Sequence, residues 1–278
     1  GMAGGSGKRS ARKVFLRCSA FLKNSGLTGS GSFVKKINRI KSWFRFVTTK
    51  AAINAAVLLC NEGTVRMSQK FFVASCVFTE GEPELSRKIQ AYVREVFDFP
   101  VIRCCVASYK VREFEERMPE WYRGEWSEIP HYEKFPAGST MVSLCHNCSA
   151  IFEERHPEIQ RQSLWELILE DENFPYPNYG GEKITVQDCW RQKENRAEQD
   201  AVRELLRRMN FEVVELEENY ARTKFCGYSL YQPQPPRNPK LAPKRFLYGA
   251  QGLFQEHSPE EKQRLMREHC AKISTEKV

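Results

Sequence analysis

Hydrophobic and polar positions alternate along residues 70–217 in a way that predicts strands and helices in turn. Short apolar runs predict strands, and apolar residues three or four positions apart predict helices, as with Leu85, Ile89 and Val93. The predicted strands are residues 70–76, 99–105, 139–145, 183–189 and 211–217, and the predicted helices are residues 83–97, 110–118, 148–156, 163–171 and 195–210. This order predicts a three-layer α/β fold with mainly parallel strands.

The two ends of the chain follow other patterns. Residues 1–66 form a basic leader that we expect to be largely disordered, because Gly, Ser, Lys and Arg dominate its first half. We expect a chain that begins at Met67 to fold without it. Near the other end, residues 233–246 are a proline-rich connection, and residues 259–273 are predicted to form a last helix.

Charge is unevenly distributed over the 278 residues. The leader carries 13 Lys and Arg and a single acid, Glu62, whereas the rest of the chain carries 30 basic and 34 acidic residues. The net charge of +8 therefore comes from the leader, and we do not expect the main body to bind nucleic acid. No run of 18 apolar residues predicts a membrane span, so we expect a soluble, cytoplasmic protein.

Cysteines mark the ends of the predicted strands. Cys76, Cys104 and Cys105 end two of them, and Cys145 begins a Cys-x-x-Cys pair with Cys148, which gives the spacing C-x27-CC-x39-CxxC. Ligands of open α/β sheets bind at the carboxyl ends of the strands, so these thiols are expected to meet. In a reducing compartment such thiols are more often metal ligands or redox groups than structural disulfides.

The second part of the chain repeats some of this pattern. Cys189 ends a strand, a helix and a short strand follow, and Cys226 comes after 36 intervening residues, before Gly227. This indicates an internal duplication with a period of about 115 residues. We expect one copy in residues 67–180 and a degenerate, truncated copy in residues 181–278. Cys189 and Cys226 should then lie close together and form a possible second site facing the first.

Together these motifs resemble the cysteine-rich CCG domain of B-type heterodisulfide reductases and of the iron–sulfur proteins of glycolate and lactate oxidation. The resemblance covers about residues 70–230. It implies an oxidoreductase-like protein with a redox partner protein and a [4Fe-4S] cluster, which in heterodisulfide reductase is of an unusual non-cubane type. The ligands that it implies are Cys76, Cys104, Cys105, Cys145 and Cys148.

The chain departs from the family pattern at two points. The triplet reads Cys104-Cys105-Val106 in the first copy and Phe225-Cys226-Gly227 in the second, and the second copy has no CxxC. Two other interpretations therefore stay open. One is a zinc-binding structural or interaction module, and the other is a metal-free thiol–disulfide exchanger that uses the Cys145–Cys148 pair.

A few other residues are candidates for the site. Trp190, Arg191 and Tyr228 follow Cys189 and Cys226 and are possible lining residues, although Trp190 could equally belong to the core. His146 lies inside the CxxC, and we expect it to be a solvated loop histidine. Cys270 is expected to be a free thiol on the last helix. The catalytic residues of any reaction are not indicated by the sequence.

Overall fold

A parallel four-stranded sheet organises the first part of the molecule. The structure is a computed structural model, and it describes residues 70–103, 111–132 and 134–277. The strands are β1 (Lys70–Val73), β2 (Val101–Ile102), β3 (Thr140–Ser143) and β4 (Gln160–Ser163), in the spatial order β2-β1-β3-β4. All neighbouring strands pair in parallel, so their carboxyl ends lie at one edge of the sheet.

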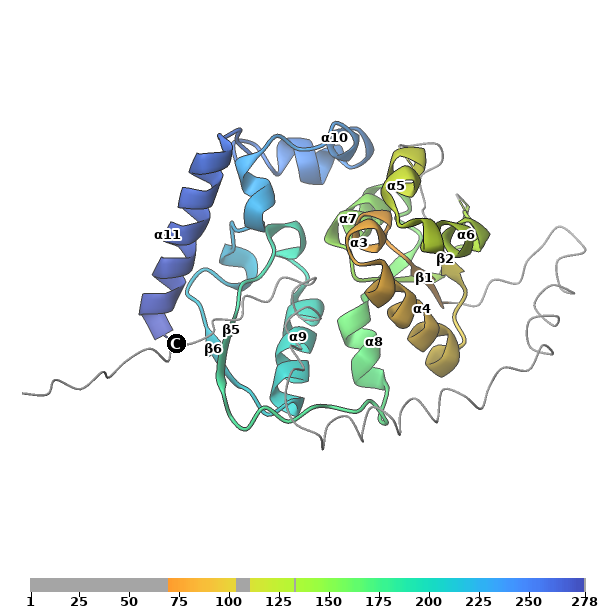
Figure 1. Cartoon of the computed structure of the whole chain (residues 1–278), viewed down its shortest axis with the longest axis horizontal. Coiled ribbons are helices and arrows are strands. Elements are labelled where there is room, and N and C mark those ends of the chain that lie inside the picture. Colours follow the sequence, from red (N-terminus) through yellow and green to blue (C-terminus); the bar gives the residue numbers. More distant parts are fainter. Residues whose placement is uncertain (1–69, 104–110, 133, 278) are drawn as a thin grey trace, which may run out of the picture.

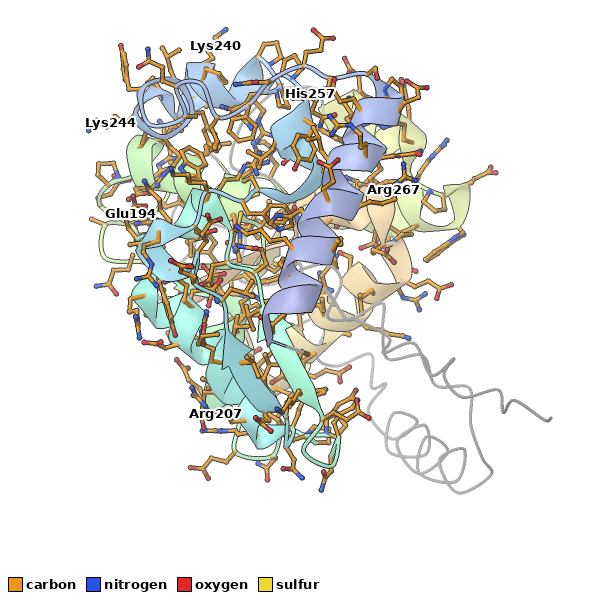
Figure 2. All side chains as sticks on the ribbon, turned by 90° about the vertical axis from the view of Figure 1, so that its left-hand side faces the viewer. Glu194, Arg207, Lys240, Lys244, His257 and Arg267 are labelled. Carbon is orange, nitrogen blue, oxygen red and sulfur yellow. The ribbon has the colours of Figure 1, made fainter. Side chains whose placement is uncertain are left out.

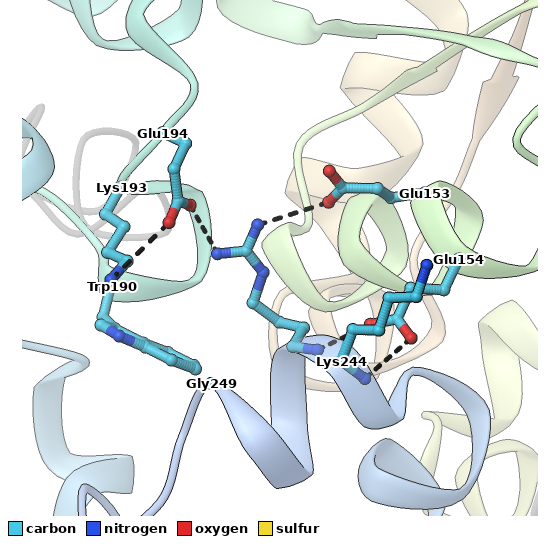
Figure 3. A pocket seen from close by; sticks show the side chains of 8 residues that line it. Glu153, Glu154, Trp190, Lys193, Glu194, Lys244 and Gly249 are labelled. Atoms are coloured by element: carbon cyan, nitrogen blue, oxygen red, sulfur yellow. Dashed lines mark hydrogen bonds and ion pairs between the residues drawn. The ribbon is translucent and has the colours of Figure 1, made fainter.

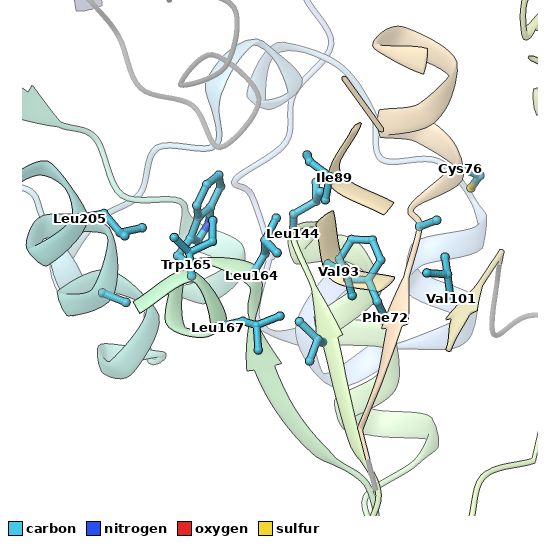
Figure 4. Packing of buried hydrophobic residues seen from close by; sticks show 14 of the residues in the cluster. Phe72, Cys76, Ile89, Val93, Val101, Leu144, Leu164, Trp165, Leu167 and Leu205 are labelled. Atoms are coloured by element: carbon cyan, nitrogen blue, oxygen red, sulfur yellow. The ribbon is translucent and has the colours of Figure 1, made fainter. Parts of the chain in front are cut away.

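Helices connect these strands and cover both faces of the sheet. The helices of this part are α3 (Cys76–Gly81), α4 (Pro83–Phe97), α5 (Val111–Arg117), α6 (Glu120–Glu128), α7 (His146–Arg155) and α8 (Leu164–Glu170). Helices α4, α6 and α8 contribute to one apolar cluster, and α7 contributes to another. The first cluster is shown in Figure 4.

Alternate side chains of β1 explain why the sheet has two apolar faces. Phe72 packs into the first cluster, whereas Phe71 and Val73 pack into the second, and all three are buried. Successive side chains of a strand point to opposite faces, so an uninterrupted apolar run needs a layer on each side. The sheet is therefore the middle of three layers.

A two-stranded parallel sheet organises the second part. Its strands β5 (Lys183–Val186) and β6 (Glu212–Glu215) are connected through η1 (Trp190–Gln192) and α9 (Arg196–Arg208). The chain continues through η2 (Tyr220–Arg222), η3 (Gly227–Tyr231), α10 (Arg237–Leu241), η4 (Lys244–Tyr248) and α11 (Pro259–Lys277). Helix α9 lies on one side of β5 and β6, and α11 lies on the other (Figure 1).

The two parts share one core. Leu164, Trp165 and Leu167 of α8 belong to the same apolar cluster as Leu205 and Leu206 of α9. Figure 4 shows Leu205 next to the α8 side chains. In the view of Figure 2, α11 crosses the outside of the second part, with Arg267 on its outer side. The first and second parts are therefore packed as one body through α8 and α9.

The predicted α/β fold with parallel strands is confirmed. The boundary expected near residue 180 falls in the segment between α8 and β5. A strand–helix–parallel strand unit occurs in both parts, but the first sheet has four strands and the second has two. The duplication itself stays a prediction. The basic leader lies outside the described residues.

Several elements differ from the sequence prediction. The strand expected over residues 99–105 is paired only at Val101–Ile102. Helix α6 and strand β4 were not predicted, and the proline-rich connection contains α10 and η4. Pro236 and Pro243 are the residues that precede these two short helices, a position where the missing N–H of proline has little cost. Within the described residues, no helix is long and apolar enough to cross a membrane.

Candidate functional site

Cys145 and Cys148 lie where β3 passes into α7. Cys145 is the residue that caps the N-terminus of α7, and Cys148 is in the first turn of this helix. Strand β3 ends at Ser143 because the pairing with β1 ends there, so the cysteines lie at the carboxyl edge of the sheet. The positive end of the α7 dipole favours a negative charge on a sulfur at this position.

The surroundings of Cys145 favour its thiolate. A hydrogen bond from the Cys148 thiol lowers the pKa of the Cys145 thiol to about 5, despite burial, which opposes ionisation. The Ser75 side chain and the charge of His146 act in the same direction. Ser75 follows β1, so two adjacent strands of the sheet contribute to stabilising this sulfur. The CxxC thus presents a thiolate at Cys145 near neutral pH.

Cys189 and Cys226 form a second close pair. Their Sγ atoms are 3.6 Å apart, and Cys226 is buried. The sequence predicted that these two sulfurs lie close together, and the structure confirms it. Cys189 follows β5 and precedes the short turn η1, whereas α9 begins only at Arg196. The helix predicted over residues 195–210 is α9, and the short turn η1 separates it from Cys189.

Hydrogen bonds join the two loops that carry this pair. Trp190 N donates to Phe225 O at 2.9 Å, next to both cysteines. The Thr223 hydroxyl donates to the carbonyl of Asp188 at 2.9 Å, and Tyr220 N donates to the Asp188 carboxylate at 2.7 Å. All three bonds join residues 188–190 to residues 220–225, and together they hold Cys226 beside Cys189.

A buried ion pair holds the loop that carries Cys189. The guanidinium group of Arg203, on α9, binds both carboxylate oxygens of Asp188 at 2.9 and 3.1 Å, and it also binds Glu215. Arg203 is fully buried. Asp188 immediately precedes Cys189, so this ion pair sets the position of the cysteine. No local motif indicates this role for Arg203.

Arg191 places a positive charge beside the second pair. Its Nη1 atom donates a short hydrogen bond to Cys226 Sγ and a longer one to the Ser229 hydroxyl, at 3.3 Å. Arg191 therefore lies beside this cysteine pair, as the sequence predicted. Arg191 Nε and Gln192 Nε2 are buried donors without an acceptor among the described residues. These donors are available to sulfur or to another anionic acceptor.

The two thiols of this pair differ in acidity. The hydrogen bond from Cys226 holds the pKa of Cys189 well below its ordinary value, although burial opposes this. His146 and Arg191 lower it further. Burial and the neighbouring sulfur of Cys189 raise the pKa of Cys226 well above its ordinary value. Cys189 is therefore the sulfur of the pair that ionises more readily, and Cys226 is the one that keeps its proton more strongly.

His146 connects the two cysteine pairs. Its Nε2 atom is 2.9 Å from the Glu198 carboxylate of α9, and it also interacts with Cys189. Glu198 is buried and accepts a second hydrogen bond from Asn195 at 3.1 Å. Only 14% of the His146 side chain is exposed, so our expectation of a solvated loop histidine was wrong. The contact was not visible in the sequence because His146 and Glu198 are 52 positions apart.

All four of these cysteines contact a single apolar cluster. Cys148 and Cys226 are buried members of the second cluster, and Cys145 and Cys189 pack against it. Cys76, at the start of α3, packs instead into the first cluster. Among the described residues, no three His, Cys, Asp or Glu side chains are grouped as in a metal site. The other two predicted ligands, Cys104 and Cys105, lie outside the described residues.

The remaining predicted lining residues have different surroundings. Trp190 is a buried member of the second cluster, so it belongs to the core as well as to the loop beside Cys189. Tyr228 is exposed and follows Cys226 and Gly227 on η3. Cys270 lies on α11, outside both clusters, and burial raises the pKa of its thiol.

A polar cavity of about 350 Å³ is lined by Trp190 and by charged residues of α7, of η4 and of the segment after η1 (Figure 3). Its charged walls are already paired. Arg245 binds Glu194 at 2.5 Å and Glu153 at 3.4 Å, and Glu154 accepts backbone N–H groups at the start of η4. The cavity therefore offers few unpaired groups to a ligand, and the cysteine pairs remain the stronger candidate site.

Comparisons with models of known protein families, with characterised proteins and with solved structures found no match to this chain. The function must therefore be inferred from the residues of the site.

Proposed function

We propose that this protein is an iron–sulfur redox protein whose cluster is held by cysteines at the carboxyl edge of the four-stranded sheet. The observation that carries the proposal is the Cys145–Cys148 pair, in which a thiolate is stabilised at the N-terminus of α7. Thiolates are the ligands that iron–sulfur clusters use. The spacing of the cysteines, and the resemblance to the CCG domain, support the same interpretation.

The residues of this edge fit such a cluster in their chemistry. Cys145 and Cys148 supply two soft ligands, and Cys104 and Cys105 would supply two more from the segment that follows β2. Cys76 follows Ser75, whose side chain contacts Cys145, but Cys76 itself packs into the first cluster and is not grouped with Cys145 and Cys148, so it would become a fifth ligand only if the start of α3 moved. When bound, the cluster would accept and donate single electrons.

The protein's own groups would tune this site. Ser75 and the Cys148 thiol stabilise negative charge on Cys145. His146, held by Glu198, brings a further positive charge when protonated. The apolar second cluster limits the access of water, and low dielectric strengthens each of these interactions. An oxidoreductase role in the cytoplasm, with a redox partner protein and without nucleic acid, is part of the same proposal.

The proposal is tested with variants of the anaerobically purified protein. Cys145→Ser and Cys148→Ser should each lose iron and visible absorbance, while far-ultraviolet circular dichroism stays that of the parent. Cys270→Ser is the matched control, because this thiol lies on α11 away from the site, and it should keep the full iron content. Retention of iron and absorbance in both site variants would refute the proposed ligands, and one zinc ion in place of iron would favour the structural zinc module.

A further inference from the structure

The Cys189–Cys226 pair has the arrangement of a reactive dithiol. Its sulfurs are in contact at 3.6 Å, and a disulfide bond is about 2.05 Å long, so a movement of under about 2 Å would join them. The hydrogen bonds between their loops keep the sulfurs facing each other. We propose that Cys189 and Cys226 form a redox-active pair that exchanges with disulfides, separately from the cluster ligands.

The two cysteines differ in their exposure to solvent, and we assign each a different role in the exchange. As a whole residue Cys189 is partly exposed, whereas Cys226 is buried. A disulfide that approaches from solvent can therefore reach Cys189 first. Cys189 is the attacking sulfur, and Cys226 is the resolving sulfur that acts from within the protein.

The exchange is balanced without a further reactant. The Cys189 thiolate attacks one sulfur of the substrate disulfide, the substrate S–S bond breaks, and one substrate thiolate leaves and takes up a proton. Cys226 then attacks the Cys189 sulfur of the mixed disulfide and gives up its proton. The second substrate thiol leaves, and the Cys189–Cys226 disulfide remains. The protein has lost two electrons, and the substrate has gained them as two thiols.

Arg191 contributes to the second step. Its guanidinium donates a hydrogen bond to Cys226 Sγ, the sulfur that must become a thiolate before it attacks. Arg191 is itself buried, and its side chain lies over the ring of Phe254, with 5.1 Å between the guanidinium carbon and the ring centroid. A charge fixed in this way stabilises the resolving thiolate without the need to rearrange.

The same guanidinium argues against a metal at this pair. Two thiolates on one tetrahedral zinc ion, with bonds of about 2.3 Å, would be about 3.8 Å apart, so the sulfur–sulfur distance alone would fit zinc. A zinc ion would, however, have to bind Cys226 next to a positively charged group that already donates a hydrogen bond to that sulfur. Like charges at such a distance repel strongly in a buried site.

The test uses the full chain with oxidised and reduced glutathione as the redox buffer. Free thiols are alkylated, and the products are identified by mass spectrometry of peptides. The expected product under oxidising conditions is a Cys189–Cys226 disulfide that dithiothreitol reverses. In Cys226→Ser, glutathione should remain attached to Cys189. In Cys189→Ser, Cys226 should stay unmodified because it is buried. A pair that stays reduced while Cys270 reacts with glutathione would overturn the proposal.

Two further measurements separate this inference from the proposed cluster. Arg191→Met should slow the resolution of the mixed disulfide by about tenfold, the effect of removing one hydrogen bond to a charged group, and Arg191→Lys should restore part of it. Cys189→Ser and Cys189→Ala should keep the iron that Cys145→Ser loses. Loss of iron in both Cys189 variants would make this residue a ligand and overturn the dithiol. Absence of iron from the parent protein would refute the cluster while the glutathione result still decided the dithiol.

Discussion

The ion pair of Arg203 with Asp188 should be a main support of the second cysteine pair, and Asp188→Asn tests this. Both side chains are buried, with 0% and 5% of their surface exposed. The substitution keeps the shape of the side chain but removes its charge, and one carboxylate oxygen becomes an amide nitrogen that cannot accept from Arg203. Arg203 then keeps only Glu215 as a charged partner.

The expected cost follows from this burial. Breaking a buried ion pair by removing one partner typically costs about 3–5 kcal/mol, because the other charge is left without compensation. Glu215 still binds Arg203, so we expect the lower end, about 3 kcal/mol. For a domain of this size, a loss of about 3 kcal/mol lowers the midpoint of thermal unfolding by roughly 6–12 °C.

Urea unfolding followed by circular dichroism measures the free energy, and a thermal scan gives the midpoint. Asp200→Asn is the matched control, because the pair of Asp200 with Arg196 has the same charges but lies in solvent, with more than half of each side chain exposed. It should change stability far less. If Asp188→Asn were no more destabilising than Asp200→Asn, the ion pair would not support the loop of Cys189 as described.

Three other substitutions or conditions test the packing. Burial raises the pKa of Glu215, but hydrogen bonds from Arg203 and Asn219 outweigh this and leave the pKa below its ordinary value. The ionised Glu215 should therefore stabilise the fold above the unfolded pKa of about 4.3, and this contribution should be lost as the pH falls through the folded pKa. Acid unfolding of the parent protein and of Glu215→Gln measures the difference. Ser163→Ala should cost about 1 kcal/mol in urea unfolding, because Ser163 caps α8 through a reciprocal bond with Glu166. Leu167→Ala should cost about 3 kcal/mol by the same assay, while the exposed Leu247→Ala should change little; equal effects would contradict the shared core.

The fold was predictable where apolar residues alternate with a clear period. The apolar run Phe71–Val73 needs a layer on both faces, and the sequence shows this directly. Strand β4 could not be predicted, because its residues 160–163 are polar and lie at the edge of the sheet, where only one neighbour strand imposes a pattern. Helix α6 was missed because it is short and contains Gly124, and only Tyr122 and Trp126 mark its buried face.

The sequence predicted those features of the candidate site that depend on adjacent residues and on the repeated cysteine spacing. The repeated spacing indicated that Cys189 and Cys226 approach each other, and they do. The neighbours that give these thiols their character come from distant positions. Glu198 reaches His146 from the next helix but one, and Arg203 reaches Asp188 from α9. Such contacts depend on how α8 and α9 pack, which no short motif encodes.

The central proposal is that cysteines at the carboxyl edge of the sheet hold an iron–sulfur cluster. The most direct measurement is the content of iron, acid-labile sulfide and zinc per chain in protein purified without oxygen. A [4Fe-4S] cluster predicts about four iron and about four sulfide per chain, with visible absorbance that bleaches on reduction. Protein with neither iron nor sulfide after anaerobic purification and reconstitution, or with one zinc ion per chain, would contradict the proposal.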